Sequence, residues 1–415
     1  MWKPILDGPM REEALETACG IVRELREQVP GITDPTLCDG LTGIAVLFDY
    51  YAKCTGDTAV REEALEPLEQ GLSALEHVPM APALHEGFAG IAWAAVHLAG
   101  ATDREASDEW LEPVDAALLE PLERSPWQGD YDLMRGLVGY GLYALEKGPT
   151  PYARKMVTAV VNRLSELAET REEGVTWFTP KELLTEYALQ EGPHGYYNLG
   201  LAHGVPGVIG FLGRACEAGV PVPAAKPLLE RSVAWLLAQS FPPEAQSLFP
   251  RCVGPEIEPA EARLAWCYGD PGVSAALLMA ARCAGEASWE REAVRIAGHA
   301  ARRPFDSSGV LDASFCHGAS GVAHMLNRVH QAAGDEELGR ATVKWLRYTL
   351  DLRRRGEGIG GYLSRVFEPD GPNWAAEPGI LSGAAGVALV LLAASSDVQP
   401  DWDRMFLLSA PAERG

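Results

Sequence analysis

Three residues in the second half of the chain have the types and spacing of a metal centre. Cys267 and Cys316 each stand two residues before a glycine, and His317 follows the second cysteine directly. Thiolate and imidazole are ligands that Zn²⁺ prefers, and three protein ligands leave its fourth tetrahedral position open for chemistry. A single buried cysteine is more often a small hydrophobic residue, but the shared offset makes that interpretation unattractive. We therefore predict one zinc ion held by these three side chains.

Two other residues share this offset and are rival ligands. Cys38 and His85 each stand two residues before the glycine of their own segment. Spacing alone does not choose between these residues and the first set. Cys267 and Cys316 lie in adjacent repeats of the pattern described next, whereas the rivals lie further round the predicted ring. This favours a pocket-lining or structural role for Cys38 and His85.

Seven Gly-x-x-Gly pairs recur along the chain and indicate how these residues are positioned. Their first glycines are Gly40, Gly87, Gly136, Gly204, Gly269, Gly318 and Gly383. After most pairs comes an Ala-rich run that is apolar nearly all round, such as "GVALVLLAAS", which is typical of a buried helix. Charged segments with apolar residues three and four apart alternate with these runs and predict amphipathic helices. These segments span 11–29, 61–78, 106–124, 152–170, 224–240, 288–302 and 336–354.

This alternation predicts an all-α fold, an α/α toroid in which seven inner helices lie inside a ring of seven outer helices. No regular alternation of strands and helices suggests a parallel sheet. We expect residues 1–415 to form a single toroid domain, with insertions around 171–199 and 241–262 that hold short strands or loops. The glycines would let the inner helices approach closely and would ease the turn at each helix start.

The residues before the glycine pairs differ between repeats, and they should converge at one end of the ring, its mouth. Asp132 comes from repeat three and His203 from repeat four, while Arg263, Trp266 and Tyr268 come from repeat five. Imidazole titrates near neutral pH, which suits proton transfer. Asp132 and Arg263 would be an ordinary ion pair elsewhere, but at the mouth they are candidates for the active site.

The bulk composition restricts the partners. The net charge is −23, from 58 acidic and 35 basic residues, which argues against nucleic acid and against direct docking on an anionic membrane. A cationic peptide remains compatible, although acidity also simply maintains solubility. No signal peptide or bilayer-spanning stretch is visible, and the eight cysteines are scattered. We expect a cytoplasmic protein.

Three motifs resemble those of the lanthionine synthetase C-like family, in particular its stand-alone lantibiotic cyclases. They stand as "GLAHG" (200–204), "WCYGDPG" (266–272) and "CHGASG" (316–321). The second motif matches the family pattern throughout, and the resemblance covers essentially the whole chain. Ser320 departs mildly from the family, which more often has alanine there.

The resemblance implies a cyclase that adds cysteine thiols to dehydroalanine or dehydrobutyrine of a dehydrated precursor peptide, leader plus core. The products would be the (methyl)lanthionine thioether rings of a lanthipeptide. It also implies zinc held by Cys267, Cys316 and His317, and active-site roles for the five other mouth residues. It argues against Cys38 and His85 as ligands. A separate dehydratase is implied, with an exporter as a further partner and membrane association only through such a complex.

The expected thiol addition suggests roles for these residues, and more than one assignment is possible from the sequence. His203 is the first candidate for the acid that protonates the enolate, oriented by Asp132, and Arg263 could steady the enolate oxygen. Alternatively, His203 removes the thiol proton and Tyr268 or water is the acid. Trp266 and Tyr268 would line the site.

The sequence is also compatible with other functions. The same fold could add thiols outside antibiotic biosynthesis, or a zinc-stabilised protein could bind peptides without catalysis. A toroidal glycosidase would need two acids at the mouth; only Asp132 and Asp270 qualify there, so this interpretation is disfavoured.

Overall fold

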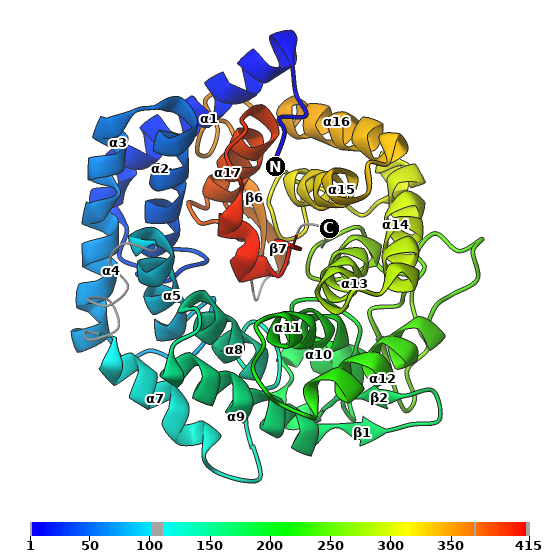
Figure 1. Ribbon diagram of the computed structural model, residues 1–415. Coiled ribbons are helices and arrows are strands. Elements are labelled where there is room, and N and C mark those ends of the chain that lie inside the picture. Colours follow the sequence, from blue (N-terminus) through cyan, green and yellow to red (C-terminus); the bar gives the residue numbers. More distant parts are fainter. Residues whose placement is uncertain (1, 101–110, 369–370, 412–415) are drawn as a thin grey trace.

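Two concentric rings of helices form the protein in a computed structural model that describes residues 2–100, 111–368 and 371–411 (Figure 1). The inner ring consists of α2 (Leu41–Thr55), α5 (Phe88–Ala99), α8 (Leu137–Glu146), α11 (Val205–Glu217), α13 (Asp270–Ala284), α15 (Ala319–Ala333) and α17 (Ala384–Ser395). The outer ring consists of α1 (Gly8–Gln28), α3 (Thr58–Glu63), α4 (Leu65–His77), α7 (Glu112–Leu122), α9 (Pro151–Leu167), α12 (Ala225–Ala238), α14 (Ala287–Arg302) and α16 (Glu336–Asp351). The predicted α/α toroid is confirmed.

The two rings differ in burial as their sequence patterns predict. Every residue of α17 is buried, whereas α14 buries only one stripe of small and aliphatic side chains. Each predicted amphipathic segment corresponds to one outer helix, except 61–78, which covers the end of α3 and all of α4. The segment at 106–124 begins outside the described residues, and α7 starts at Glu112. No helix in the described ranges is both long and apolar enough to cross a bilayer.

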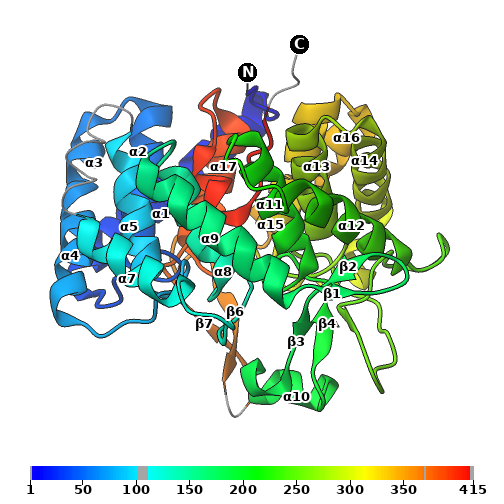
Figure 2. The same ribbon diagram turned by 60° about the horizontal axis from the view of Figure 1, so that its bottom comes forward.

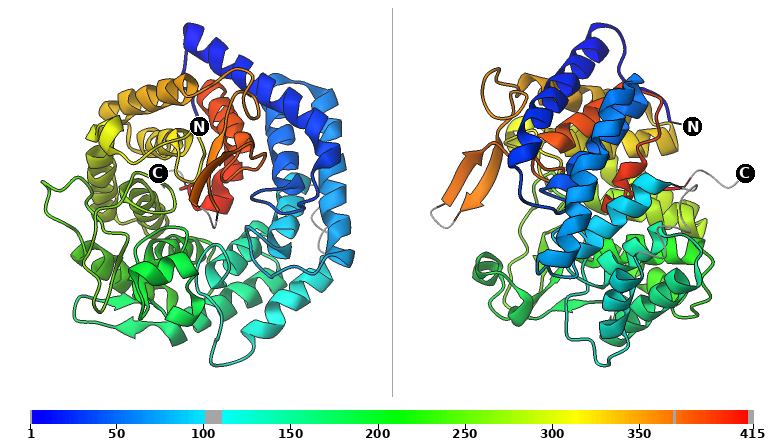
Figure 3. Two further views of the ribbon diagram at one scale, coloured as in Figure 1. Left: turned by 180° about the vertical axis from the view of Figure 1, so that it is seen from behind. Right: turned by 90° about the vertical axis from the view of Figure 1, so that its left-hand side faces the viewer.

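Short strands decorate the mouth. The ranges 171–199 and 241–262 contain β2 (Val175–Thr176), β3 (Phe178–Thr179), η2 (Lys181–Leu183), α10 (Glu186–Glu191), β4 (Tyr196–Asn198) and β5 (Cys252–Val253), and β1 (Glu169–Thr170) lies just before the first of them. The antiparallel order is β1-β2 and β3-β4-β5. A hairpin not expected from the sequence, β6 (Ser364–Glu368) and β7 (Gly371–Ala375), pairs Arg365 with Trp374. This hairpin and α10 project on the same side of the rings (Figures 2 and 3).

The turn before each inner helix has one repeated construction. Three residues before the first glycine, a large apolar side chain is fully buried in every repeat: Leu37, Leu84, Leu133, Leu201, Trp266, Phe315 and Ile380. The glycines are needed because the turn folds back on itself. A Cβ on Gly90 would lie 1.8 Å from the Leu84 carbonyl oxygen, and Gly269 has a φ of +97° as well as a carbonyl 2.1 Å from its Cβ position. Glycine tolerates both constraints.

Backbone hydrogen bonds join these turns around the ring. Trp266 N–H donates to the Cys316 carbonyl (2.8 Å), and Cys316 N–H donates to the Leu381 carbonyl (2.8 Å). Ile380 N–H donates to the Cys38 carbonyl (2.7 Å), which connects the seventh turn to the first. Further bonds run from Cys38 N–H to the His85 carbonyl (3.1 Å) and from Leu133 N–H to the Ala202 carbonyl (3.2 Å), so most neighbouring turns are joined, and we call this row of turns the collar.

The C-terminal segment around η4 (Asp401–Phe406) packs against the turns of the mouth, where Phe406 contacts His85, Trp266 and Phe315. The fully buried Asp403 carboxylate accepts hydrogen bonds from Arg328 Nε (2.6 Å) and Nη2 (2.8 Å), and it lies 2.6 Å from His324 Nε2. Burial raises the pKa of Asp403, but Arg328 and His324 outweigh burial and hold that pKa below its ordinary value.

Asp403→Asn is expected to destabilise the fold by about 3–5 kcal/mol, because Arg328 would remain buried without its counter-charge. Since the pKa of Asp403 is depressed in the folded state, its contribution is present above about pH 4 and is lost as pH falls through the folded pKa. Urea unfolding of both proteins at several pH values measures the difference. The exposed Asp397→Asn is the matched control; equal stability of both variants would contradict this role.

Candidate active site at the mouth of the ring

Cys267 and Cys316 lie in contact on neighbouring turns of the collar. A hydrogen bond from Cys316 lowers the pKa of the Cys267 thiol to about 5; burial opposes this shift and Arg263 adds to it. The same contact raises the pKa of Cys316 well above its ordinary value. The two sulfur atoms therefore lie close enough to shift each other's pKa in opposite directions.

His317 follows Cys316 and faces a carboxylate. Its Nε2 is buried, has no hydrogen bond in the described structure, and lies 3.6 Å from Asp312 Oδ2. Asp312 is itself held in place, because Oδ1 accepts the Ser314 N–H (3.0 Å) and Oδ2 accepts the Arg365 N–H (2.9 Å) from β6. Burial raises the pKa of Asp312, but His317 and these donors outweigh it and lower that pKa overall.

Arg263 lies on the side of the thiols. Its Nη2 is 3.8 Å from Cys267 Sγ. Burial lowers the pKa of the guanidinium, but the two cysteines raise it overall. Gly309 packs on the arginine stem, since a Cβ at Gly309 would lie 2.7 Å from Arg263 Cβ. The Cys267 sulfur is thus a neighbour of the Arg263 guanidinium in the structure.

His203 and Asp132 form a pair from adjacent turns. His203 Nδ1 lies 2.5 Å from Asp132 Oδ2, while Asp132 Oδ1 accepts the Arg135 N–H at 2.7 Å. Only 1% of the Asp132 side chain is exposed, against 35% for His203. Burial lowers the pKa of His203, but the Asp132 carboxylate outweighs it, and the pKa is raised overall. The imidazole is therefore oriented, partly accessible and biased toward its protonated form.

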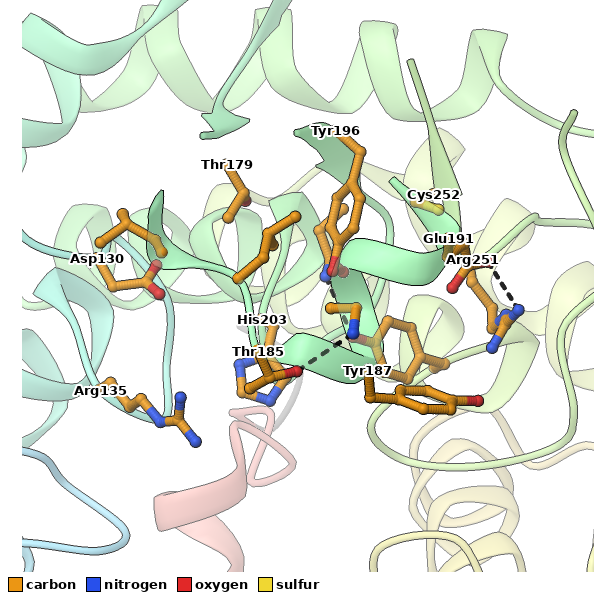
Figure 4. Close-up of a pocket in the computed structure, with 15 residues that line it drawn as sticks. Asp130, Arg135, Thr179, Thr185, Tyr187, Glu191, Tyr196, His203, Arg251 and Cys252 are labelled. Carbon is orange, nitrogen blue, oxygen red and sulfur yellow. Dashed lines mark hydrogen bonds and ion pairs between the residues drawn. The ribbon is translucent and has the colours of Figure 1, made fainter. Parts of the chain in front are cut away.

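A pocket of about 180 Å³ opens beside His203, between the toroid and the arm formed by η2 and α10 (Figure 4). Tyr268 and Asn198 line it together with His203, and Leu184 and Tyr187 line it from the arm. The Tyr268 hydroxyl accepts a hydrogen bond from Asn198 Nδ2 at 3.1 Å. Burial raises the pKa of Tyr268 far above its ordinary range, so the phenol stays protonated.

Trp266 was expected to line the site, and the structure places its side chain in the core. The indole is fully buried, Nε1 donates to the Phe406 carbonyl (3.0 Å), and the ring packs edge-on against Phe406. It occupies the position of the buried apolar residue in the other six turns. This geometry gives Trp266 a packing role that supports its neighbour Cys267.

The rival residues Cys38 and His85 bond to each other. Cys38 Sγ lies 3.0 Å from His85 Nδ1, and both side chains are fully buried. Burial lowers the pKa of His85 to about 3, and it raises the pKa of Cys38 well above the ordinary value. They form a neutral pair, and the His85 ring packs against Phe406.

Sequence reasoning missed two residues of the mouth, Asp312 and Asn198. Each stands six residues before the first glycine of its turn, as Asp34 and Asp130 do. In all four, Oδ1 accepts the backbone N–H two residues later, which is a turn that Asx side chains favour. The recurring Asx at this offset was a signal that could have identified them.

The donor set fits a zinc ion in its chemistry. Across the described ranges, no three Cys, His, Asp or Glu side chains are gathered as a formed metal centre. Nevertheless, two thiols in contact and an adjacent histidine offer the ligand types of Zn²⁺. A histidine ligand usually has a carboxylate beside its other ring nitrogen, and Asp312 has that place beside His317. The zinc ion itself stays a prediction.

Fold and site together define a class of protein, the α/α toroids with a thiol and histidine cluster at the mouth. The chain belongs to the lanthionine synthetase C-like family, whose sequence model matches residues 31–407. The matches reported below support the expected enzyme class, the cyclase component of a lanthionine synthetase.

Two comparisons agree with this assignment. The chain is 25% identical over 379 residues to the nisin biosynthesis protein NisC of Lactococcus lactis subsp. lactis, covering 86% of this chain and 84% of that protein. The solved structure of nisin cyclase superposes with a TM-score of 0.75 at 20% identity, covering 95% of this chain and 97% of that one. The structural likeness supports the fold.

Proposed function

We propose that this protein is a zinc-dependent cyclase that forms thioether rings in a dehydrated precursor peptide. A cysteine thiol of the peptide would add to dehydroalanine or dehydrobutyrine in the same peptide, giving lanthionine or methyllanthionine. The observation that carries the proposal is the arrangement of the mouth. A thiol pair with an arginine and a histidine lies on two neighbouring turns, and a histidine–aspartate pair lies on the two preceding ones.

On the thiol side, Cys267, Cys316 and His317 would hold the zinc ion. Bound zinc supplies a Lewis acid that keeps a coordinated thiol deprotonated at neutral pH, where a free thiol is mostly protonated. Arg263, close to Cys267, adds positive charge that favours thiolates on this side of the mouth. Asp312 orients His317 from behind.

On the alkene side, His203 and Asp132 would deliver one proton to Cα. As the sulfur bonds to Cβ, the π electrons of the alkene move onto Cα and the neighbouring carbonyl oxygen as an enolate. His203 then delivers a proton to Cα, which completes the addition. Asp132 fixes the ring through Nδ1 and so leaves Nε2 as the atom that exchanges the proton. The proton released by the thiol returns to His203 from solvent, so the reaction is balanced.

The substrate would be a peptide with leader and core, dehydrated by a separate enzyme. The net charge of −23 is compatible with a cationic peptide. An exporter as a further partner, and a cytoplasmic location with membrane association through such a complex, are parts of the same proposal.

Purified protein prepared without added metal is expected to contain about one zinc per chain and to convert a chemically dehydrated peptide to its thioether. Elemental analysis and the loss of free thiol by mass spectrometry measure the two results. Tight peptide binding without loss of thiol would overturn the proposal in favour of a zinc-stabilised binding protein. Addition of free glutathione in preference to ring closure would indicate thiol addition outside lanthipeptide biosynthesis.

A further inference from the structure

The orientation of the Asn198 amide is fixed by its surroundings. Its Oδ1 accepts the Gly200 N–H at 2.8 Å, a bond that only the carbonyl oxygen of the side chain can make. The NH₂ group therefore faces the Tyr268 hydroxyl at 3.1 Å. Asn198 is 2% exposed, and Gly200 packs directly on the Tyr268 ring, so the three residues form one rigid unit.

This orientation determines where the Tyr268 proton points. Since the amide can only donate, the Tyr268 oxygen accepts, and its own hydrogen must be directed elsewhere. In the described part of the chain, Asn198 is the one hydrogen-bond partner of this hydroxyl. Tyr268 lines the pocket beside His203, so its O–H is available there as a hydrogen-bond donor.

The same pocket contains the group that would protonate Cα. In an enolate, the oxygen and Cα are separated by two bonds, about 2.4 Å. A donor for the oxygen and an acid for Cα must therefore share one cavity. His203 and Tyr268 do share it, whereas Arg263 does not line it and lies against Cys267 instead.

We propose that the pocket under the arm is the subsite for the α,β-unsaturated acyl group of the dehydroamino acid, with Tyr268 O–H donating to its carbonyl oxygen and Asn198 as the positioning residue for that donor. This assignment rests on the proposed function and deepens it. The oxygen gains charge as the C–S bond forms, so the hydrogen bond strengthens in the transition state and acts on kcat more than on KM. Leu184 and Tyr187 of the arm cover the pocket and would contact the residue next to the alkene.

Two single variants and their combination test the assignment. Tyr268→Phe removes the donor and is expected to lower kcat by about 10²–10³-fold. Asn198→Asp keeps the oxygen that accepts Gly200 N–H, but its second oxygen, when ionised, accepts the Tyr268 proton and withdraws it from the pocket. Because an ordinary carboxyl is ionised throughout pH 6 to 9, this loss should be present across the range, and the double variant should be no slower than Tyr268→Phe alone. A structural defect would instead make the double variant slower than Tyr268→Phe.

The assay uses a synthetic peptide with one dehydroalanine and one cysteine, and it follows thioether formation from pH 6 to 9. Asn162→Asp, on the exposed face of α9, is the matched control. Should Asn198→Asp fail to fold, Asn198→Ser retains a turn-capping oxygen and removes only the donor, with an expected loss of about tenfold. Wild-type kinetics in Tyr268→Phe, or additive losses in the double variant, overturn this assignment alone. A wild-type protein that forms no thioether overturns the proposed function as well.

Discussion

Replacing Cys316 with alanine is expected to abolish both zinc retention and cyclisation while the toroid stays folded. Loss of an outer-shell partner of a metal costs about 10–100-fold in affinity, and loss of a direct ligand should cost more. The change removes one of the two sulfur atoms in contact at the mouth, but the backbone bonds of Cys316 to the collar remain. Elemental analysis, circular dichroism and the thioether assay measure the three results. Cys216→Ala, on α11 away from the mouth, is the matched control.

A second variant at this position separates metal binding from reactivity. Cys316→His keeps three ligands but replaces a thiolate with a neutral imidazole, which leaves the metal site more positive and a bound substrate thiolate less nucleophilic. We expect alkylation to fall more than zinc content. Equal retention of both would contradict the idea that two thiolates are needed to activate sulfur, and full zinc content in Cys316→Ala would exclude Cys316 as a ligand.

His203→Ala is expected to lower the cyclisation rate by about 10²–10⁴-fold, the usual contribution of a positioned acid or base, with zinc content unchanged. The expected result follows from the pair with Asp132 and from the opening of His203 onto the pocket. An unchanged rate would remove His203 from the mechanism and leave Tyr268 or water as the acid.

Asp132→Asn tests the same pair through its pH dependence. Asp132 is what outweighs burial and raises the pKa of His203, so removing its charge should lower that pKa. Because the acid must be protonated, the alkaline limb of kcat/KM should move to lower pH. Measurement of the full pH–rate profile decides the matter, with Asp397→Asn as control. An unshifted alkaline limb would mean that His203 does not supply the proton.

The helices and their relation to the site could be predicted because their signals are local. Seven apolar runs behind seven glycine pairs admit few arrangements, and residues before the glycines then meet at one end. The burial of Trp266 could also have been predicted, because every turn has a large apolar residue three positions before its first glycine. Trp266 was instead interpreted as a site residue because it stands next to Cys267 in the motif.

Other features depend on contacts between distant segments. The direction of Arg263 is determined partly by Gly309, which the sequence does not place beside it. The β6–β7 hairpin has strands that pair only with each other within the described chain, and its backbone is tied to Asp312 on another turn. Asn198 matters through Tyr268, 70 residues later in the chain. Spacing patterns carry no information about such pairs.

The collar of turns also sets the order in which the molecule can be assembled during translation. Two hydrogen bonds link early and late parts of the sequence. One runs from Ile380 N–H to the Cys38 carbonyl, and the other runs from the Trp2 indole to the Ala393 carbonyl, 391 residues away. Contacts this distant in sequence form late, after helix pairs that are neighbours along the chain. Cys316 itself is bonded to Leu381 of the final turn. We therefore expect a nascent chain to carry every residue of the site before the site forms, because the site is completed only when α17 packs beside α1 and α2.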